Sequence, residues 1–377
     1  MVDAVTARGD STRCVRAGVG PAAAGQPFLP GPVLAAPYHL SPNEGSESDS
    51  YGRASNPGWR GLEAALAELE GDGDAAVAAA VTGSGMAAIT VLLRALLHSQ
   101  DVLVLPSDGY YQVRAYAAER LVPLGVHVRE VATPEMTEAV SGARLVLAET
   151  PSNPGLDVVD LRALSTASHA AGALLAVDNT TATPLGQQPL RLGADVVVAS
   201  GTKALSGHSD LLMGYVATAD AGVLDAVRRE RALSGSVLGP FETWLAHRSL
   251  GSAALRLDRQ CATAAALAEA LARHPAVREL RWPGLIADPS YAVAAAQMRR
   301  FGGVLRFELA SAAAVHAFVA ASELVSAATS FGGLHTTADR RARWGDDVAP
   351  GFVRISCGIE DTDDVVRDVL AALDTLR

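Results

Sequence analysis

Lys203 is the only lysine in a chain of 377 residues, in which every other strong base is an arginine. An arginine stays protonated, whereas a lysine can lose its proton when it is buried or lies near other cations, and its free amine can then condense with a carbonyl group. A drift in composition from lysine to arginine could also leave one lysine by chance. The residue types nevertheless favour Lys203, within the segment 199–210, as a residue that forms a Schiff base.

Asp178 and two hydroxyl groups are candidates to act with Lys203 on one ligand. Asp178 follows the apolar run 174–177, and a carboxylate held against a pyridine nitrogen keeps that nitrogen protonated, so that the ring can accept electrons from a carbanion. Ser200 and Thr202 come shortly before the lysine, where their hydroxyls can reach a phosphate on the same ligand. Taken alone, these residues are also compatible with turns and a helix cap.

Residues 83–88, Gly-Ser-Gly-Met-Ala-Ala, fit the GxGxxA pattern of dinucleotide-binding loops and precede a predicted helix. That pattern also requires an acidic residue about 20 positions later at the end of a second strand, and neither Asp101 nor Asp108 ends an apolar strand. A nicotinamide site is therefore disfavoured. Small residues at a helix N-terminus still expose backbone N–H groups that can bind a single phosphate.

The composition describes a compact globular protein, with 49% hydrophobic and 19% charged residues. A net charge of -10 argues against nucleic acid and anionic membranes as partners, since both require clustered positive charge. The two dense basic segments, 228–231 and 340–343, are interpreted as solvated helix faces. No apolar run reaches the ~20 residues of a membrane span, and no signal segment is recognised, so a cytoplasmic protein is expected.

The three cysteines, Cys14, Cys261 and Cys357, lie far apart in the sequence. They form no CxxC motif and have no paired histidine spacing, so neither a metal site nor a disulfide framework is indicated. All three are expected to be reduced thiols.

Short apolar runs alternate with helical stretches in the first two thirds of the chain. Strands buried on both faces are predicted at 102–105, 145–148, 174–177, 195–199 and 211–217. Helices are predicted at 61–71, from about 85 to 97, and at about 111–121, 160–171 and 221–233. This alternation predicts an α/β domain with a mainly parallel sheet and active-site groups at the strand ends.

Three regions follow from the length and the pattern. Residues 1–50 are rich in Gly, Pro, Ala and Ser and are predicted to form an extended arm that clasps another subunit. Residues 51–238 form the predicted large domain. Residues 239–377 form a smaller α+β domain, with strands predicted at 277–281, 303–309 and 353–356 and a terminal helix near 361–376.

Five motifs in matching order are similar to those of one enzyme family. They are Tyr-Gly-Arg-Ala-Ser-Asn-Pro at 51–57, Ser-Gly-Met-Ala-Ala at 84–88, Glu-Thr-Pro-Ser-Asn-Pro at 149–154, Asp-Asn-Thr-Thr-Ala-Thr-Pro at 178–184, and Ser-Gly-Thr-Lys-Ala-Leu-Ser-Gly-His-Ser-Asp at 200–210. The chain thus resembles the cysteine and methionine metabolism family of pyridoxal-phosphate enzymes, the cystathionine γ-lyase and γ-synthase group. The resemblance implies fold type I of the pyridoxal-phosphate-dependent transferases.

The resemblance also implies catalytic and cofactor-binding roles. Lys203 would carry pyridoxal 5'-phosphate as a Schiff base, Asp178 would pair with the pyridine nitrogen, and Tyr110 would stack on the ring. The phosphate would be held by four residues, which are Gly85, Met86, Ser200 and Thr202.

Two further sets of residues complete the implied site. Tyr51 and Arg53 would reach the phosphate of a neighbouring subunit, in a homotetramer built as a dimer of dimers. Asn153, Ser330 and Arg354 would orient the phenolate of the cofactor and bind the substrate carboxylate.

The implied reaction is γ-elimination on a sulfur amino acid, in which cystathionine yields cysteine, 2-oxobutanoate and ammonia. The alternatives are γ-replacement on an activated homoserine ester, as in cystathionine γ-synthase, and cleavage of methionine. A non-catalytic scaffold with the same fold is a further alternative, against which the intact Lys203 and Asp178 argue.

Three departures from the family bear on the substrate. Thr329 precedes Ser330 where the lyases and synthases often have an acidic residue, which puts a contact to a distal ammonium group in doubt. Gln112 stands where methionine γ-lyases typically have a cysteine, and this argues against a dedicated methionine lyase. Thr181 replaces a phenylalanine and is expected to open one wall of the site.

Overall fold

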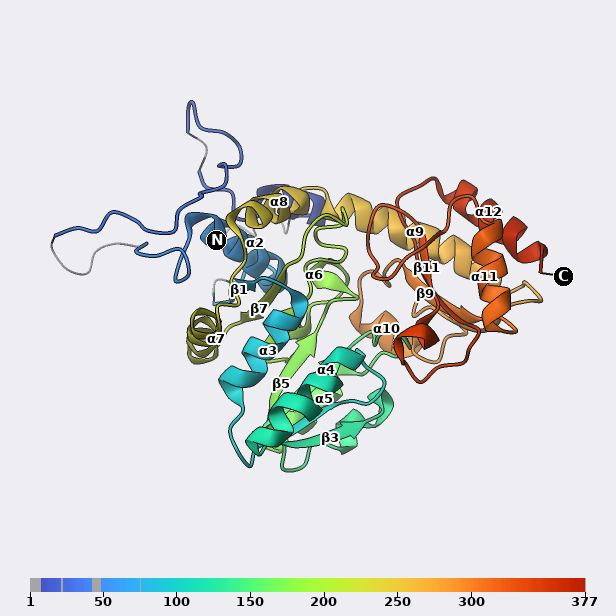
Figure 1. Cartoon of the computed structure of the whole chain (residues 1–377), viewed down its shortest axis with the longest axis horizontal. Coiled ribbons are helices and arrows are strands. Elements are labelled where there is room, and N and C mark those ends of the chain that lie inside the picture. The colour runs from blue at the N-terminus through green and yellow to red at the C-terminus, as the bar shows by residue number, and fades with distance from the viewer. Residues whose placement is uncertain (1–7, 22, 43–48, 75, 377) are drawn as a thin grey trace, which may run out of the picture.

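The computed structural model describes residues 8–21, 23–42, 49–74 and 76–376. Two bodies, each built around one β-sheet, lie side by side, and the long helix α9 (Ala253–Leu271) runs between them (Figure 1). The larger body holds the chain up to α8 (Pro240–Leu250), and the smaller body holds the C-terminal part.

The larger body contains a seven-stranded sheet in the order β1-β7-β6-β5-β4-β2-β3. Its strands are β1 (Ala78–Thr82), β2 (Val102–Pro106), β3 (His127–Val131), β4 (Leu145–Glu149), β5 (Leu174–Asp178), β6 (Val196–Ala199) and β7 (Gly214–Thr218). Strands β2 to β6 pair in parallel, which confirms the predicted mainly parallel sheet. The strand predicted at 211–217 begins only at Gly214 and runs antiparallel to both of its neighbours. The segment 200–213 forms turns rather than a crossover helix, so the chain re-enters the sheet in the opposite direction.

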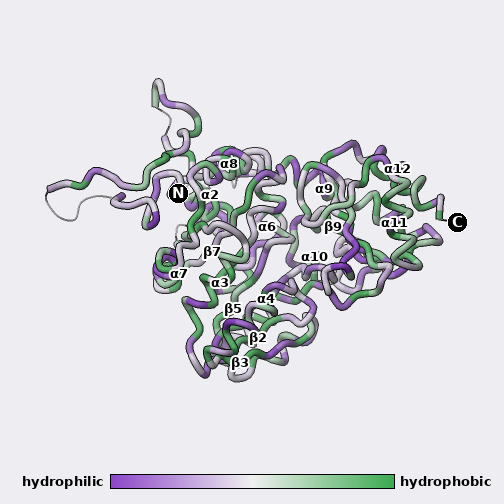
Figure 2. The backbone as a smooth tube through the Cα atoms, viewed as in Figure 1, coloured by the Kyte–Doolittle hydropathy of each residue, from purple (hydrophilic) through white to green (hydrophobic). Residues whose placement is uncertain are grey.

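Helices cover both faces of this sheet. They are α2 (Pro57–Gly71), α3 (Gly85–Leu96), α4 (Tyr111–Tyr116), α5 (Leu161–Ala170), α6 (Thr183–Gly186) and α7 (Ala221–Ser234). Successive side chains of a strand point to opposite faces, and accordingly Val196 and Val198 pack with α3 and α7, whereas Val197 packs with α2. Figure 2 shows hydrophobic residues along α3 and the strands of this sheet.

Several elements of the structure differ from the prediction in where they begin or end, and one was not predicted. Helix α2 begins four residues before the predicted residue 61 because Asn56 caps it, its side chain accepting from Gly58 N at 2.8 Å, and Pro57 fits the first helical turn. Strand β3 was not predicted, because an edge strand that is half exposed carries His127, Arg129 and Glu130 in place of an apolar run. After α4, the chain continues through a π-helical turn (Ala117–Leu121), within the predicted helix 111–121.

The smaller body contains a five-stranded sheet in the order β10-β11-β12-β9-β8. Its strands are β8 (Arg278–Arg281), β9 (Val304–Glu308), β10 (Ser326–Ala327), β11 (Thr337–Asp339) and β12 (Phe352–Ser356), and its further helices are α10 (Tyr291–Gln297), α11 (Ala312–Ala321) and α12 (Thr362–Asp374). Phe307 of β9 and Phe318 of α11 meet edge to face in the core between sheet and helices. The α+β character predicted for this part is confirmed, whereas the short strands β10 and β11 were not predicted.

Helix α9 contributes to both cores. Leu257 in its first half packs with α2 and the large sheet, whereas Leu267 and Leu271 pack in the smaller body. The domain boundary between residues 238 and 239 therefore stays a prediction.

The predicted arm contains a helix, which corrects the expectation that residues 1–50 are extended throughout. Helix α1 (Asp10–Arg16) buries Cys14 against α2 and α9, and Arg13 pairs with Asp72 at 2.7 Å. This packing stabilises a helix that is too short to persist alone. Beyond it the chain runs away from the larger body in long loops (Figure 1), while residues 1–7, 22 and 43–48 of the arm lie outside the described residues.

Candidate functional site

A cavity of about 300 Å³ lies between the two bodies, at the carboxyl ends of β4, β5 and β6. All predicted site residues except Tyr51 and Arg53 line it. The lining consists of Ser84, Gly85, Met86, Ile89, Tyr110, Glu149, Asn153, Asp178, Thr180, Ser200, Thr202, Lys203, Leu212, Thr329, Ser330, Phe331, Arg341 and Arg354.

Parallel strand ends bring the chemical groups to one edge of the sheet. Asp178 is the last residue of β5 and is paired in register with Glu149, the last residue of β4. Ser200 follows β6 directly, and Lys203 lies three residues further along the same turn. This is the position at which open α/β sheets bind ligands.

Lys203 is half-buried between groups of both charges. Burial lowers the pKa of its amine below the ordinary value, Arg354 lowers it further, and Asp178 acts in the opposite direction. Its Nζ atom lies 5.6 Å from the centroid of the Phe331 ring, within range of a cation–π contact. This environment favours the unprotonated amine that can attack a carbonyl.

Asp178 is a buried carboxylate held by a backbone donor. Thr180 N donates to Asp178 Oδ1 at 2.9 Å. Burial raises the pKa of Asp178, whereas the bond from Thr180 and the charge of Lys203 lower it. A protonated pyridine nitrogen would offset the cost of burying this charge, so the residue fits the ring of pyridoxal phosphate.

The N-terminus of α3 and the turn after β6 form a cradle that could hold the phosphate of the cofactor. Ser84 caps the helix, its Oγ accepting from Ala87 N at 3.0 Å, and Gly85 begins it. A Cβ atom on Gly85 would lie only 2.5 Å from Ser200 Cβ, so a glycine is needed for this close approach. The helix N-terminus and the Ser200 hydroxyl supply neutral donors suited to a phosphate.

The hydroxyl of Thr202, which the resemblance assigns to the phosphate, is bonded to the backbone of Met213 in the structure. This hydroxyl donates to Met213 O at 3.1 Å and accepts from Met213 N at 2.9 Å. Because the single hydroxyl hydrogen is used, Thr202 ties the lysine turn to the entry of β7, and it must release Met213 before it can donate to a phosphate.

Glu149 joins two predicted site residues and was not predicted itself. Its Oε2 accepts from Tyr110 N at 2.6 Å, and its Oε1 accepts from Asn153 N at 2.9 Å. Burial, followed by the charge of Asp178, raises the pKa of Glu149 well above its ordinary value. Its place at a strand end within a recognised motif was a signal that could have identified it.

Arg354 reaches the cavity from β12. Its Nη1 donates to Asn153 Oδ1, and its Nη2 donates to Ser330 O at 2.8 Å. Its Nε is buried and has no hydrogen-bond partner among the described residues. Burial lowers the pKa of Arg354 to about 10, and Arg341 adds to this effect. A guanidinium that lines the cavity fits a carboxylate ligand.

Tyr51 and Arg53 lie outside the Lys203 cavity of their own chain. Arg53 Nη1 donates to Ala232 O at 2.8 Å, and the guanidinium lies 5.5 Å from the centroid of the Tyr51 ring. Both residues line a separate surface cavity of about 210 Å³ together with residues 237–240. Their role in the site of a neighbouring subunit stays a prediction.

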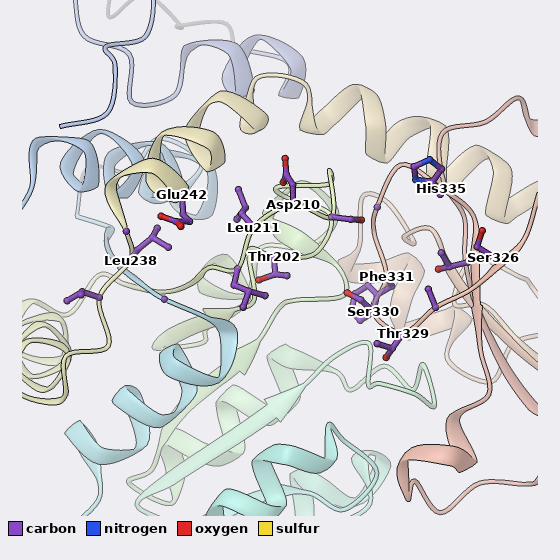
Figure 3. Close-up of a pocket in the computed structure, with 18 residues that line it drawn as sticks. Thr202, Asp210, Leu211, Leu238, Glu242, Ser326, Thr329, Ser330, Phe331 and His335 are labelled. Atoms are coloured by element: carbon purple, nitrogen blue, oxygen red, sulfur yellow. The ribbon is translucent and has the colours of Figure 1, made fainter. Parts of the chain in front are cut away.

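A wider cavity of about 1020 Å³ (Figure 3) adjoins the first and shares Thr202, Leu212 and residues 329–331 with it. Asp210, Glu242 and His335 place ionisable side chains along its wall. Thr329 thus lies where the two cavities meet.

Of the three positions expected to select the substrate, only Thr329 borders either cavity. Gln112 is exposed on α4, and Thr181 is buried and does not line either cavity, so its expected effect on one wall stays a prediction.

The two basic segments are only partly solvated, which corrects their interpretation as exposed helix faces. Arg231 is buried, pairs with Glu63 at 2.7 Å and stacks on Trp59. Arg341 is also buried and lines the cavity. Arg231 is buried against Glu63, which is distant in sequence, whereas Arg341 is buried against Asp339 and Asp346 on either side of its own turn.

Among the described residues, no three or more His, Cys, Asp or Glu side chains are placed to hold a metal ion. Within the same part of the chain, no helix has both the length and the apolar character needed to cross a membrane.

Comparison with known proteins gives matches over nearly the whole chain. Residues 33–374 match the family described as Cys/Met metabolism PLP-dependent enzyme. A protein of Streptomyces coelicolor named "Putative cystathionine gamma-lyase" is 52% identical over 372 residues, which cover 98% of this chain and 94% of the relative. L-methionine gamma-lyase of Pseudomonas putida is 38% identical over 344 residues, covering 86% of this chain and 84% of that enzyme.

A solved structure gives the same result. Cystathionine gamma synthase from Xanthomonas oryzae pv. oryzae, in complex with aminoacrylate and cysteine, superposes with a TM-score of 0.91 at 33% identity and 98% coverage of each chain. The predicted fold class and the dependence on pyridoxal phosphate are thereby confirmed. The chain belongs to the pyridoxal-phosphate-dependent enzymes of cysteine and methionine metabolism.

Proposed function

We propose that this enzyme performs γ-elimination on cystathionine and releases cysteine, 2-oxobutanoate and ammonia with the uptake of one water. The observation that carries the proposal is the shared cavity of Lys203, Asp178 and Arg354, in which one amine, one ring partner and one carboxylate ligand converge. The extended similarity to a protein named "Putative cystathionine gamma-lyase" supports the choice of substrate.

Each residue has a defined task in this reaction. When bound, pyridoxal phosphate supplies a ring that accepts the electrons left on Cα. The guanidinium of Arg354 binds the substrate carboxylate, and the amine of Lys203 removes the Cα proton. Loss of a second proton from Cβ then lets the Cγ–S bond break, and the sulfur leaves with a proton as the thiol of cysteine. Asp178 keeps the pyridine nitrogen protonated, while Tyr110 covers the ring.

The wide cavity favours a substrate that is charged at both ends. Thr329 cannot pair with the distal ammonium of cystathionine as a carboxylate would. Asp210 and Glu242 on the wall of the adjoining cavity are acidic groups available to that ammonium. Methionine carries no charge at its distal end and makes no use of them. γ-Replacement on a homoserine ester remains the second candidate, supported by the similarity to a cystathionine gamma synthase.

A neighbouring subunit is part of the proposed enzyme. The cradle around Gly85 offers neutral donors, and the Arg53 of the same chain is held by Ala232 O away from it. We therefore assign Tyr51 and Arg53 to the phosphate of a neighbouring subunit, within a homotetramer. A cytoplasmic location is proposed with it, because the three thiols form no disulfide in the structure.

The test of the reaction is 2-oxobutanoate release from cystathionine, methionine and an activated homoserine ester, measured side by side. Release is expected from cystathionine above the other two, and none from the Lys203→Ala variant. Reaction of the ester alone, and only in the presence of cysteine, would assign the enzyme to γ-replacement. Purified protein without visible cofactor absorption after addition of pyridoxal phosphate would indicate a non-catalytic scaffold.

A further inference from the structure

Arg341 brings a second guanidinium to the wall of the cavity. It lies in the short 3-10 turn Arg341–Trp344 after β11 and is only 3% exposed. The neighbouring Arg343 is exposed and stacks on Trp344 at 5.1 Å. One arginine of this basic segment is thus buried. Burial of its charge costs free energy, which partners of opposite charge must offset.

Two buried carboxylates compensate for Arg341. Its Nη1 lies 3.0 Å from Asp339 Oδ2, and its Nε donates to Asp346 Oδ2 at 2.7 Å. Asp339 Oδ2 in turn lies 3.5 Å from Arg354 Nη2. Asp339 and Arg354 face each other in the antiparallel register of β11 and β12. The four side chains form one continuous ion network.

The charges of this network balance, with two guanidiniums against two carboxylates. Arg341 is bound by both aspartates and therefore has little charge left for a ligand. Arg354, by contrast, meets only one carboxylate of the network, Asp339 at 3.5 Å, and otherwise donates to the neutral oxygens of Asn153 and Ser330. Because the two arginines differ in their contacts, Arg354 is the one that can bind a ligand, and Arg341 is the one that holds the aspartates beside it.

We propose that Arg341 is a positioning residue, which acts through Asp339 to keep the guanidinium of Arg354 directed toward the substrate carboxylate. Arg341 and Trp344, whose Nε1 donates to Asp339 Oδ1 at 2.9 Å, together hold both oxygens of that carboxylate. Without Arg341, Asp339 would be a less compensated buried charge and would draw Arg354 toward itself. The inference rests on the proposed role of Arg354 in the reaction.

The test compares Arg341→Gln with the charge-balanced double variant Arg341→Gln/Asp346→Asn and with Arg341→Lys. Glycine, which carries the amino and carboxylate groups but no leaving group, is titrated into the cofactor-loaded enzyme and followed by visible absorbance. Coupling within such networks predicts a glycine Kd raised about tenfold in the first two variants, and a smaller rise in Arg341→Lys. The KM for cystathionine rises in parallel, while kcat and the affinity for pyridoxal phosphate stay close to those of the parent enzyme.

Arg343→Gln is the matched control, since this exposed arginine of the same turn contacts only the ring of Trp344 and none of the four charged side chains of the network, and it leaves the glycine Kd unchanged. A melting temperature for each variant separates unfolding from a change in the site. An unchanged glycine Kd in the folded double variant overturns the positioning role. Arg354→Gln is measured alongside. If that variant does not weaken the binding of glycine, the result contradicts the proposed carboxylate site itself and not the network.

Discussion

At the scale of single residues, the reactivity of this site depends on how Lys203 is surrounded. The charged groups that affect its amine most are Arg354 from β12 and Asp178 at the end of β5, and burial outweighs both. Glu149 and Arg341 line the same cavity, where each is paired with other groups. A lysine in this environment is available as a base and nucleophile at a lower pH than an exposed one.

These opposing charges predict the direction in which two substitutions shift the pKa of Lys203. Arg354→Gln removes a neighbouring cation and raises the pKa, whereas Asp178→Asn removes an anion and lowers it. Because the chain has one lysine, cofactor-free protein labelled with ¹³C-lysine gives a single side-chain resonance to titrate by NMR. A titration at the ordinary pKa of lysine, unaffected by either substitution, would contradict the described environment.

At the scale of elements, a buried acid lies where α2 packs on the large sheet. Glu70, near the end of α2, accepts from Tyr215 Oη of β7 at 2.6 Å, and its second oxygen has no partner among the described residues. Burial raises the pKa of Glu70 to about 8. The folded protein therefore keeps a proton on Glu70 over a pH range in which the unfolded chain releases it.

This proton makes stability depend on pH in a defined direction. Between the ordinary glutamate pKa of 4.5 and about 8, the unfolded state binds fewer protons, so the free energy of unfolding falls as the pH rises, by up to about 1.4 kcal/mol for each pH unit. Glu70→Gln keeps the acceptor for Tyr215 and abolishes this fall. Urea unfolding across that range measures it, with Glu68→Gln as the control from the same helix. Equal slopes for the parent protein and Glu70→Gln would refute a protonated Glu70.

At the scale of the whole molecule, the site is assembled between two bodies and, in our proposal, between two subunits. The larger body supplies Lys203 and Asp178, and the smaller body supplies Arg354. Tyr51 and Arg53 line a separate cavity in their own chain. A subunit alone therefore lacks the guanidinium proposed for the phosphate.

Complementation between two inactive variants tests this arrangement. Lys203→Ala lacks the amine but offers an intact Arg53, whereas Arg53→Gln keeps its own amine. Random assembly of the two coexpressed chains gives dimers of which about half are mixed, each with one complete site, and so about a quarter of the parent activity. The control experiment coexpresses Lys203→Ala with Arg16→Gln in place of Arg53→Gln. Arg16 also belongs to the arm, but it is exposed on α1. Activity no greater than that of the separate variants would show that Arg53 does not serve the other subunit.

The sequence by itself determined the strands with apolar runs and the residues that follow them. Val102–Pro106, Leu145–Glu149 and Leu174–Asp178 were predictable because a strand buried on both faces must be apolar throughout. Strand β3 at the edge and the short strands β10 and β11 were not, since exposed or brief pairing leaves no such pattern. Lys203 and Asp178 could be placed together because parallel strands end at one edge.

Only the tertiary structure decided what each polar group bonds to. Glu149 joins Tyr110 to Asn153, Thr202 uses its hydroxyl on Met213, and Arg341 leaves the solvent for a buried ion network. A basic segment is typical of a surface, because burying an arginine is favourable only where aspartates from the same fold surround it. Asp339 and Asp346 flank the segment in the sequence, but only the folded turn directs their carboxylates and Arg341 toward one another and away from solvent.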